Sequence, residues 1–178
     1  MQLPICRNLA VAAVTMTCLW STLTLGDSSA PKRRAAAFEV KFIEEMIDHH
    51  TAAIRMTDLC IDRAVHSELR DLCETMSEAQ AAEIDEMQGW LADWYGISYE
   101  PQLNRKMQRQ IAKLAQLDGE EFELEFLQMM IKHHEMAIDN AMNCEDRAYH
   151  PELISMCENI IAAQSAEIAT MEGWLGDW

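Results

Sequence analysis

The stretch Met46-Ile47-Asp48-His49-His50 returns as Met130-Ile131-Lys132-His133-His134, at an offset of 84 residues (from 46 to 130). The similarity extends well beyond this motif. Laying residues 38–94 over residues 122–178 without a gap gives 29 identities in 57 positions, and every cysteine and histidine in one copy has its counterpart in the other. The chain is therefore an internal tandem repeat, and we expect the two copies to perform its function together.

The composition favours a soluble, almost entirely helical protein. With 178 residues the chain is long enough for one domain with a substantial core. Only 6 Gly and 4 Pro, against 13 Met, indicate long helices. The formal net charge of −16 argues against nucleic acid or an anionic membrane surface as a partner, because both would repel the protein. A solvated acidic surface is the simplest interpretation of that charge.

The first thirty residues are typical of an export signal. Arg7 is the only charged side chain before Asp27, and residues 9–25 are apolar or hydroxylated throughout. Threonines and serines weaken this run as a membrane-spanning helix, although retention as an N-terminal anchor is an alternative. We therefore expect a signal peptide and leader over residues 1–30, a loose basic segment over 31–35, and a periplasmic or secreted protein.

The cysteines that follow the signal predict two disulfides. Cys60 and Cys73 are 13 residues apart, and so are Cys144 and Cys157. An even number of equally spaced cysteines in an exported chain favours the bridges Cys60–Cys73 and Cys144–Cys157. A metal site built from all four thiolates is the alternative.

Each copy reads as a helical hairpin. Between residues 36 and 62 the apolar residues recur in steps of three and four, which places both histidines of the motif within one wide buried stripe. A second helix is expected from residues 66–68 to residue 94 or 95. In the second copy Pro151 occupies the matching first turn, where its missing N–H costs nothing. The tryptophans of both second helices are predicted to pack as apolar plugs at the ends of the hairpins.

The connection between the copies decides the fold class. Residues 96–101 break the chain, a shorter amphipathic helix is expected over residues 102–117, and Asp118 with Glu121 resembles a capping box for the next helix. Two hairpins joined by a long crossover form a ferritin-like four-helix bundle. The predicted all-α domain spans residues 36–178, with repeat one at 38–94, the connector at 95–121 and repeat two at 122–178.

The stripes that are predicted to be buried contain polar side chains, which need hydrogen-bond or metal partners there. A single histidine on a core face is usually a hydrogen-bonded structural residue, but here two adjacent pairs lie opposite the glutamine and glutamate of each second helix. Each buried polar group that is left unpaired costs about 1–3 kcal/mol, so this set has to be satisfied collectively. A closed hydrogen-bond network would satisfy it, and so would a metal ion; the ligand-like spacing favours the metal.

Methionine, three residues before each histidine pair, indicates which metal. Di-iron bundles place Glu at that position, whereas this chain has Met46 and Met130. A thioether suits Cu(I) and is a poor ligand for iron in a carboxylate cage. Met87 and Met171 lie four residues after the glutamates of the second helices, and we expect them near the same level of the bundle.

The doubled Phe-x-x-x-Met-Ile-x-His-His-x-x-Ala-Ile motif and the two Gln-x-x-Glu-Ile-x-x-Met-x-x-Trp-Leu runs, together with the export signal, resemble a known family. It is an exported ferritin-like family labelled as a domain of unknown function, to which the CopM-type periplasmic copper-binding proteins belong. The resemblance covers residues 36–178 and implies a four-helix bundle outside the cytoplasm that binds, or confers resistance to, copper or silver. A second methionine of the family pattern is present as Met56, whereas Asn140 takes its place in copy two, with Met136 and Met142 nearby.

These arguments lead to one set of candidate ligands. The predicted metal ligands are Met46, His49, His50, Met130, His133 and His134. A second tier, as further ligands or as residues that surround the metal, comprises Met56, Gln80, Glu83, Met87, Gln164, Glu167 and Met171.

The function we expect is sequestration or buffering of Cu(I), with Ag(I) as a second cargo, by a protein that is not an enzyme. Metal ions are the expected partners, with no nucleic acid and no membrane contact beyond the export signal. No serine, cysteine or lysine constellation indicates nucleophilic catalysis. Two alternatives remain open: a ferritin-like iron or redox protein that uses Glu83 and Glu167 with the histidines, and an envelope module whose polar core is a closed network.

Overall fold

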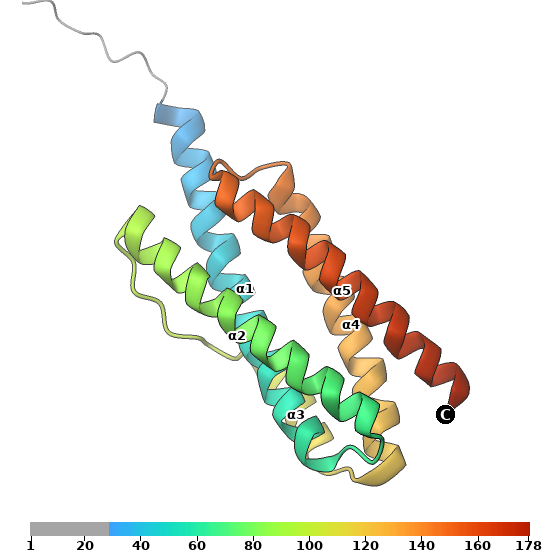
Figure 1. The fold of residues 1–178 in the computed structure, drawn as a ribbon. Helices are drawn as coiled ribbons and strands as arrows, with labels where there is room; N and C mark the ends of the chain where they lie inside the picture. The colour runs from blue at the N-terminus through green and yellow to red at the C-terminus, as the bar shows by residue number, and fades with distance from the viewer. Residues whose placement is uncertain (1–28) are drawn as a thin grey trace, which may run out of the picture.

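Residues 29–178, the part of the chain that the computed structural model describes, form α1 (Ser29–Arg63), α2 (Ser67–Tyr95), α3 (Arg105–Leu114), α4 (Gly119–Glu145) and α5 (Pro151–Asp177) (Figure 1). The all-helical prediction is confirmed. Of the signal peptide and leader predicted at residues 1–30, residues 1–28 lie outside the described residues, and residues 29 and 30 begin α1. None of the described helices is both long enough and apolar enough to cross a membrane.

Helix α1 begins earlier than expected. Residues 31–35 lie within it, where a loose segment was predicted. The lysine, arginines and alanine of this stretch are all good helix formers, and Pro31 is tolerated in the first turn because its missing N–H would have had no partner there. The basic character of these residues is therefore compatible with a continuation of the helix.

Each repeat is a hairpin closed by a disulfide, as predicted. Helix α1 pairs with α2, and α4 pairs with α5. Cys60 is bonded to Cys73 and Cys144 to Cys157, with Cα atoms 6.3 and 6.4 Å apart. Because all four sulfur atoms are used in these bridges, the four-thiolate metal site is ruled out. By the loop-entropy estimate, each bridge stabilises the fold by about 3 kcal/mol.

The two hairpins meet through α1 and α4, which run antiparallel and pack side by side (Figure 1). Two apolar clusters result. One combines the disulfide end of the first hairpin with the beginning of α4, and the other combines the disulfide end of the second hairpin with the beginning of α1. Along α1 the second cluster ends at Ile47 and the first begins at Ala53; along α4 the clusters change between Ile131 and Ala137. The histidine pairs occupy the layer between the clusters.

Helix α3 lies in the crossover between the hairpins and packs against α1 and α4. Asp48 of α1 anchors the beginning of the crossover, since its carboxylate accepts hydrogen bonds from Tyr99 Oη at 3.0 Å and from the backbone N–H of Gln102 at 2.6 Å. Arg63 anchors the other end by donating to the carbonyl oxygen of Leu117 at 2.7 Å. The position of α3 over α1 and α4 is thereby fixed from both sides.

The predicted capping box at Asp118 is wrong. Asp118 is the residue at which α4 begins, but its side chain makes no capping hydrogen bond. Its Oδ1 instead lies 3.2 Å from Arg63 Nη1. Helix α3 does have a side-chain cap, because Asn104 Oδ1 accepts from the backbone N–H groups of Lys106 and Met107.

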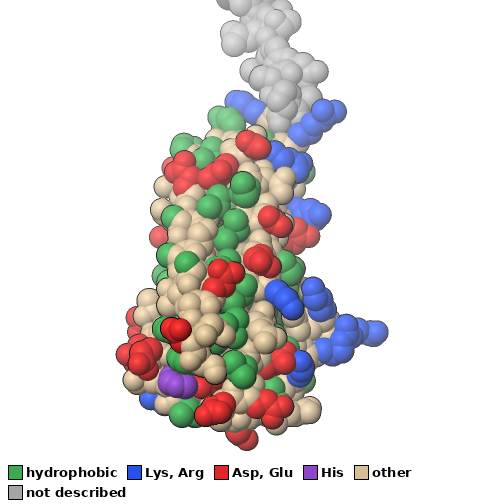
Figure 2. All heavy atoms as spheres, turned by 90° about the vertical axis from the view of Figure 1, so that its right-hand side faces the viewer, with side chains coloured by type: hydrophobic (Ala, Val, Ile, Leu, Met, Phe, Trp, Pro, Cys, Tyr) green, Lys and Arg blue, Asp and Glu red, His purple; other side chains and the backbone are tan. Residues whose placement is uncertain are grey.

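The tryptophans are not buried plugs. Trp90 stacks on Trp94, and Trp174 stacks on Trp178, with ring centroids 5.0 and 5.3 Å apart. All four are partly accessible, and Trp178 is 38% exposed. Trp90 and Trp94 pack against one apolar cluster and Trp174 packs against the other, so the indole rings cover the edge of the core without being enclosed by it. On the face shown in Figure 2, Asp and Glu side chains are scattered among hydrophobic and other side chains, and most Lys and Arg side chains lie toward one edge.

Candidate metal centre

The first histidine of each pair meets its counterpart at the centre of the bundle. His49 of α1 and His133 of α4 lie with their ring centroids 3.5 Å apart and an interplanar angle of 32°. They are 4% and 7% exposed, and none of their four ring nitrogens has a hydrogen-bond partner among the described residues. Because α1 and α4 run antiparallel, the repeat brings the same residue of each copy to one point.

The second histidine of each pair faces its own hairpin. His50 Nε2 lies 2.7 Å from Glu83 Oε2, which makes a hydrogen bond. His134 Nε2 lies at the same distance from Glu167 Oε2, but the pair is not aligned for a hydrogen bond. The predicted juxtaposition of the glutamates with the histidines is thus present in both hairpins, with His50 and His134 as the partners. We define the four histidines and these two glutamates, together with Gln80 and Gln164, as the histidine layer.

The histidine layer is under-satisfied. Ten buried side-chain nitrogen and oxygen atoms in the described part of the chain have no hydrogen-bond partner, and all ten belong to this layer. They include both ring nitrogens of three histidines and the amide oxygens of Gln80 and Gln164. Native proteins pair the great majority of such groups, because each orphan costs about 1–3 kcal/mol. The unpartnered atoms of the described residues are thus concentrated in one layer, where a ligand could use their lone pairs.

The central histidines are held in the neutral form that binds metals. Burial lowers the pKa of His49 to about 3, and the neighbouring His50 and His134 rings add to the effect. Burial also lowers the pKa of His133 well below its usual value of 6.5, with a further contribution from His49. Neutral imidazoles keep a nitrogen lone pair available for a metal ion at physiological pH.

The predicted methionine ligands are buried but do not all come together. Met46 belongs to the same apolar cluster as Met87, whereas Met130 shares the other cluster with Met56 and Met171. The second-tier methionines therefore divide into two groups, one on each side of the histidine layer. Met56 of copy one lies in the cluster of Met130. Its counterpart in copy two, the exposed Asn140, lies in the other half of the bundle, where it lines a pocket with Phe38 and Phe42.

The donors available to a metal are mixed. Within residues 29–178, no group of three or more His, Cys, Asp or Glu side chains stands ready to hold a metal ion. A site that uses the His49–His133 pair therefore needs thioether sulfur, or a movement of side chains, to complete its coordination. Imidazole with thioether is the donor set of a soft monovalent ion such as Cu(I), so the residues present fit such an ion.

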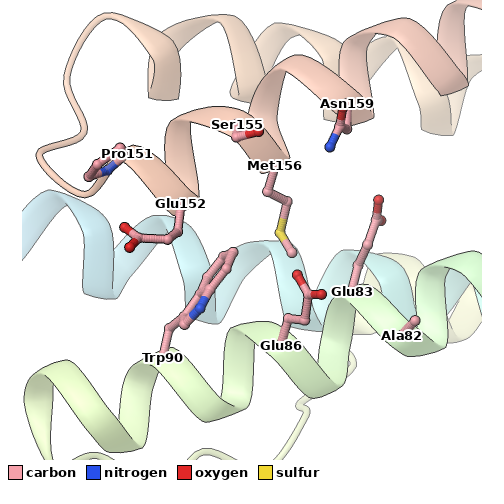
Figure 3. A pocket seen from close by; sticks show the side chains of 9 residues that line it. All are labelled: Ala82, Glu83, Glu86, Trp90, Pro151, Glu152, Ser155, Met156 and Asn159. Atoms are coloured by element: carbon pink, nitrogen blue, oxygen red, sulfur yellow. The ribbon is translucent and has the colours of Figure 1, made fainter.

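Two openings reach the layer from opposite sides. A groove of about 640 Å³ runs between α2 and α5, and Glu83, Glu86 and Met156 point into it (Figure 3). A smaller cavity of about 210 Å³ lies beneath α3 and is lined by His49 and His133. The smaller cavity thus borders the central histidines, whereas the groove touches the layer at Glu83.

Two buried glutamates were missed by the sequence analysis. Glu39 of α1 accepts hydrogen bonds from the backbone N–H groups of Tyr149 and His150 at 2.7 and 2.8 Å, and from His150 Nδ1 at 2.9 Å. Glu123 of α4 does the same for Val65 and His66, at 2.7, 2.8 and 2.8 Å. Each glutamate thereby holds the two residues that come just before a helix of the other hairpin, and we call each arrangement a clasp. A tryptophan covers each clasp histidine: Trp94 stacks on His150, and Trp178 on His66, with ring centroids 3.9 Å apart in both pairs.

The fold and the histidine layer define a class: an all-helical bundle of two disulfide-closed hairpins with a histidine-rich polar layer in its core. The chain belongs to the family described as Domain of unknown function (DUF305), whose model matches residues 39–175. The resemblance inferred from the doubled motif is thereby confirmed.

Solved structures of similar proteins include one called CopM. In its Cu(I)-bound and Cu(II)-bound forms CopM is 33% and 32% identical to this chain, with a TM-score of 0.71 in both cases. These matches cover 79% of this chain and 96% and 97% of CopM. A DUF305 fragment from Deinococcus radiodurans matches with 28% identity and a TM-score of 0.72, covering 81% of this chain and 99% of the fragment. No curated protein matches by sequence.

Proposed function

We propose that this protein binds Cu(I), and Ag(I) as a second cargo, outside the cytoplasm, and that it sequesters or buffers the metal rather than catalysing a reaction. The six ligands are Met46, His49, His50, Met130, His133 and His134. The observation that carries the proposal is the set of buried, unpartnered polar atoms, all of which lie in the layer that these histidines form. A cation that accepts their lone pairs removes the penalty that the layer imposes on the fold.

The alternatives fit the layer less well. A closed polar network would leave few orphans, yet both central histidines lack partners. An iron centre would need carboxylates that bridge two metal ions, whereas Glu83 and Glu167 each approach the histidine of their own hairpin. No observation favours iron, so only copper and silver are carried forward.

The similar structures support the choice of metal. CopM has been solved in Ag-bound, Cu(I)-bound and Cu(II)-bound forms. A location outside the cytoplasm is supported by the two disulfides, which persist in oxidising compartments, together with the export-signal pattern of the first thirty residues.

Two measurements test the proposal. Elemental analysis of protein purified from the cell envelope or the medium of copper-grown cells should find copper; its absence after reconstitution with Cu(I) would contradict the proposed function. Anaerobic competition titrations should then show that the Met46→Leu, Met130→Leu double variant binds Cu(I) about tenfold or more weakly, as expected when groups at a metal site are removed.

Leucine nearly conserves the volume of methionine, so the fold should survive the double substitution. Met76→Leu is the matched control, because Met76 is equally buried in an apolar cluster but is not a proposed ligand. If the double variant and the control bind Cu(I) as tightly as the wild type, Met46 and Met130 are not ligands.

A further inference from the structure

The cavity beneath α3 contains more donors than the repeated motif accounts for. His49 and His133 line it, and so do Met107 of α3 and Met136 of α4. Two imidazoles and two thioethers from three helices thus border one space of about 210 Å³. Neither methionine recurs in the repeat: Met107 lies in the connector, and the position of Met136 in copy one is occupied by Ala52.

The two histidines are the evidence that this cavity binds a ligand. Both are more than nine-tenths buried, and all of their ring nitrogens lack partners among the described residues. Met136, by contrast, is 45% exposed, so packing in the core does not explain a methionine there. An exposed thioether above two unsatisfied imidazoles is well placed to take up a soft cation from solution.

The structure holds Met107 in position. The side chain of Asn104 caps the first turn of α3 by accepting from the N–H groups of Lys106 and Met107. Lys113 at the other end of α3 lies 2.6 Å from Glu125 of α4. Together with the anchors at Asp48 and Arg63, these contacts fix the helix that carries Met107 over the His49–His133 pair.

The charged side chains at the cavity bear on the charge of the ion that it would bind. Lys106 and Lys132 also line it. A nearby positive charge raises the electrostatic energy of Cu(II) twice as much as that of Cu(I), because Coulomb repulsion is proportional to the charge of the ion. Both lysines are exposed, so solvent screens them and this effect is small. The preference for Cu(I) and Ag(I) comes chiefly from the thioethers and neutral imidazoles.

We propose that the cavity beneath α3 is a capture site for Cu(I), in which Met107 and Met136 supply thioether ligands and His49 and His133 supply imidazole ligands. This inference rests on the proposed function, since it requires the histidine layer to bind Cu(I). It adds two ligands outside the repeated motif, and it assigns to α3 the role of carrying one of them.

The experiment compares wild type with the Met107→Leu, Met136→Leu double variant, using Cu(I) held by a colorimetric chelator under anaerobic conditions. The variant should bind Cu(I) about tenfold or more weakly. X-ray absorption of the copper-loaded protein should show fewer sulfur neighbours per copper in the variant. Met142→Leu is the matched control: Met142 is on the same helix and is 55% exposed, but it does not line the cavity.

Each outcome decides a different question. If wild type binds no Cu(I), the proposed function fails and the capture site fails with it. If wild type binds Cu(I) and the double variant keeps both its affinity and its sulfur count, the capture site alone is refuted. Should the double variant lose its helical circular dichroism, Met136→Leu alone, at a half-exposed position, provides the same comparison.

Discussion

Replacing both central histidines with leucine should make the metal-free protein more stable. In the structure, His49 and His133 are buried against each other, and their ring nitrogens have no hydrogen-bond partners. Each unsatisfied ring costs about 1–3 kcal/mol, so the pair costs about 2–6 kcal/mol. Repacking around leucine costs less than about 1.5 kcal/mol per site. The net expectation for His49→Leu, His133→Leu is a gain of roughly 2 kcal/mol in the free energy of unfolding.

Urea unfolding of the apoprotein in the presence of a chelator measures this difference as a higher midpoint at an unchanged slope. His66→Leu is the matched control, because His66 donates to the buried Glu123 and its loss should destabilise the fold. With Cu(I) in thousandfold excess over its dissociation constant, wild type should gain about 4 kcal/mol and the leucine variant should gain nothing. A leucine variant less stable than apo wild type by more than about 1 kcal/mol, the largest loss that these ranges allow, would refute the reasoning, since it would mean that the histidines are already satisfied without metal.

Two further predictions concern the clasps and the helix ends. Burial alone would raise the pKa of Glu39, but hydrogen bonds from Tyr95 Oη and from the N–H groups at residues 149 and 150 outweigh it and hold the pKa below 4.5. Glu39→Gln should therefore cost about 1–3 kcal/mol at neutral pH. Because the carboxylate's contribution is present above pH 4.5 and is lost as the pH falls below it, urea unfolding should show this gap closing in acid. Gly96→Ala should lower the free energy of unfolding by about 1 kcal/mol, because Gly96 ends α2 at φ 67°. Gly89→Ala should raise it by up to about 1 kcal/mol, because Gly89 lies within the same helix and faces open space. Thermal melts measure both changes, and equal effects of the two substitutions would contradict this reasoning.

Much of the fold could be predicted from the repeat. Steps of three and four between apolar residues indicated the long helices, and the equal spacing of the cysteines predicted the Cys60–Cys73 and Cys144–Cys157 bridges. The histidines were recognised as a site because polar residues in a buried stripe conflict with the surrounding pattern. These features are local, or they are repeated in sequence, so periodicity and comparison of the copies were enough to find them.

The missed features depend on contacts between distant segments. Glu39 and Glu123 lie near the beginnings of long helices, where an acidic residue usually faces solvent, and Glu39 binds residues about 110 positions away along the chain. Their identity in the two copies was the available signal. Met107 lies in the connector, which has no second copy, so the repeat could not reveal that α3 covers the central histidines. The two-fold relation between the hairpins predicts features that are present in both repeats. It does not predict the position of α3, which belongs to neither repeat.

The reciprocal clasps give the molecule the geometry of an isologous dimer. Glu39 of the first repeat holds the helix that begins after His150 in the second, and Glu123 of the second repeat holds the helix that begins after His66 in the first. In a homodimer of single repeats, one residue of each subunit would make the same pair of contacts across a two-fold axis. Joining the two subunits in one chain converts that association into an intramolecular step, with an effective concentration in the millimolar range for a short linker. The pairing of the hairpins then no longer depends on protein concentration. The connector that contains α3 occurs once in the chain, so its sequence does not have to obey the two-fold symmetry of the hairpins.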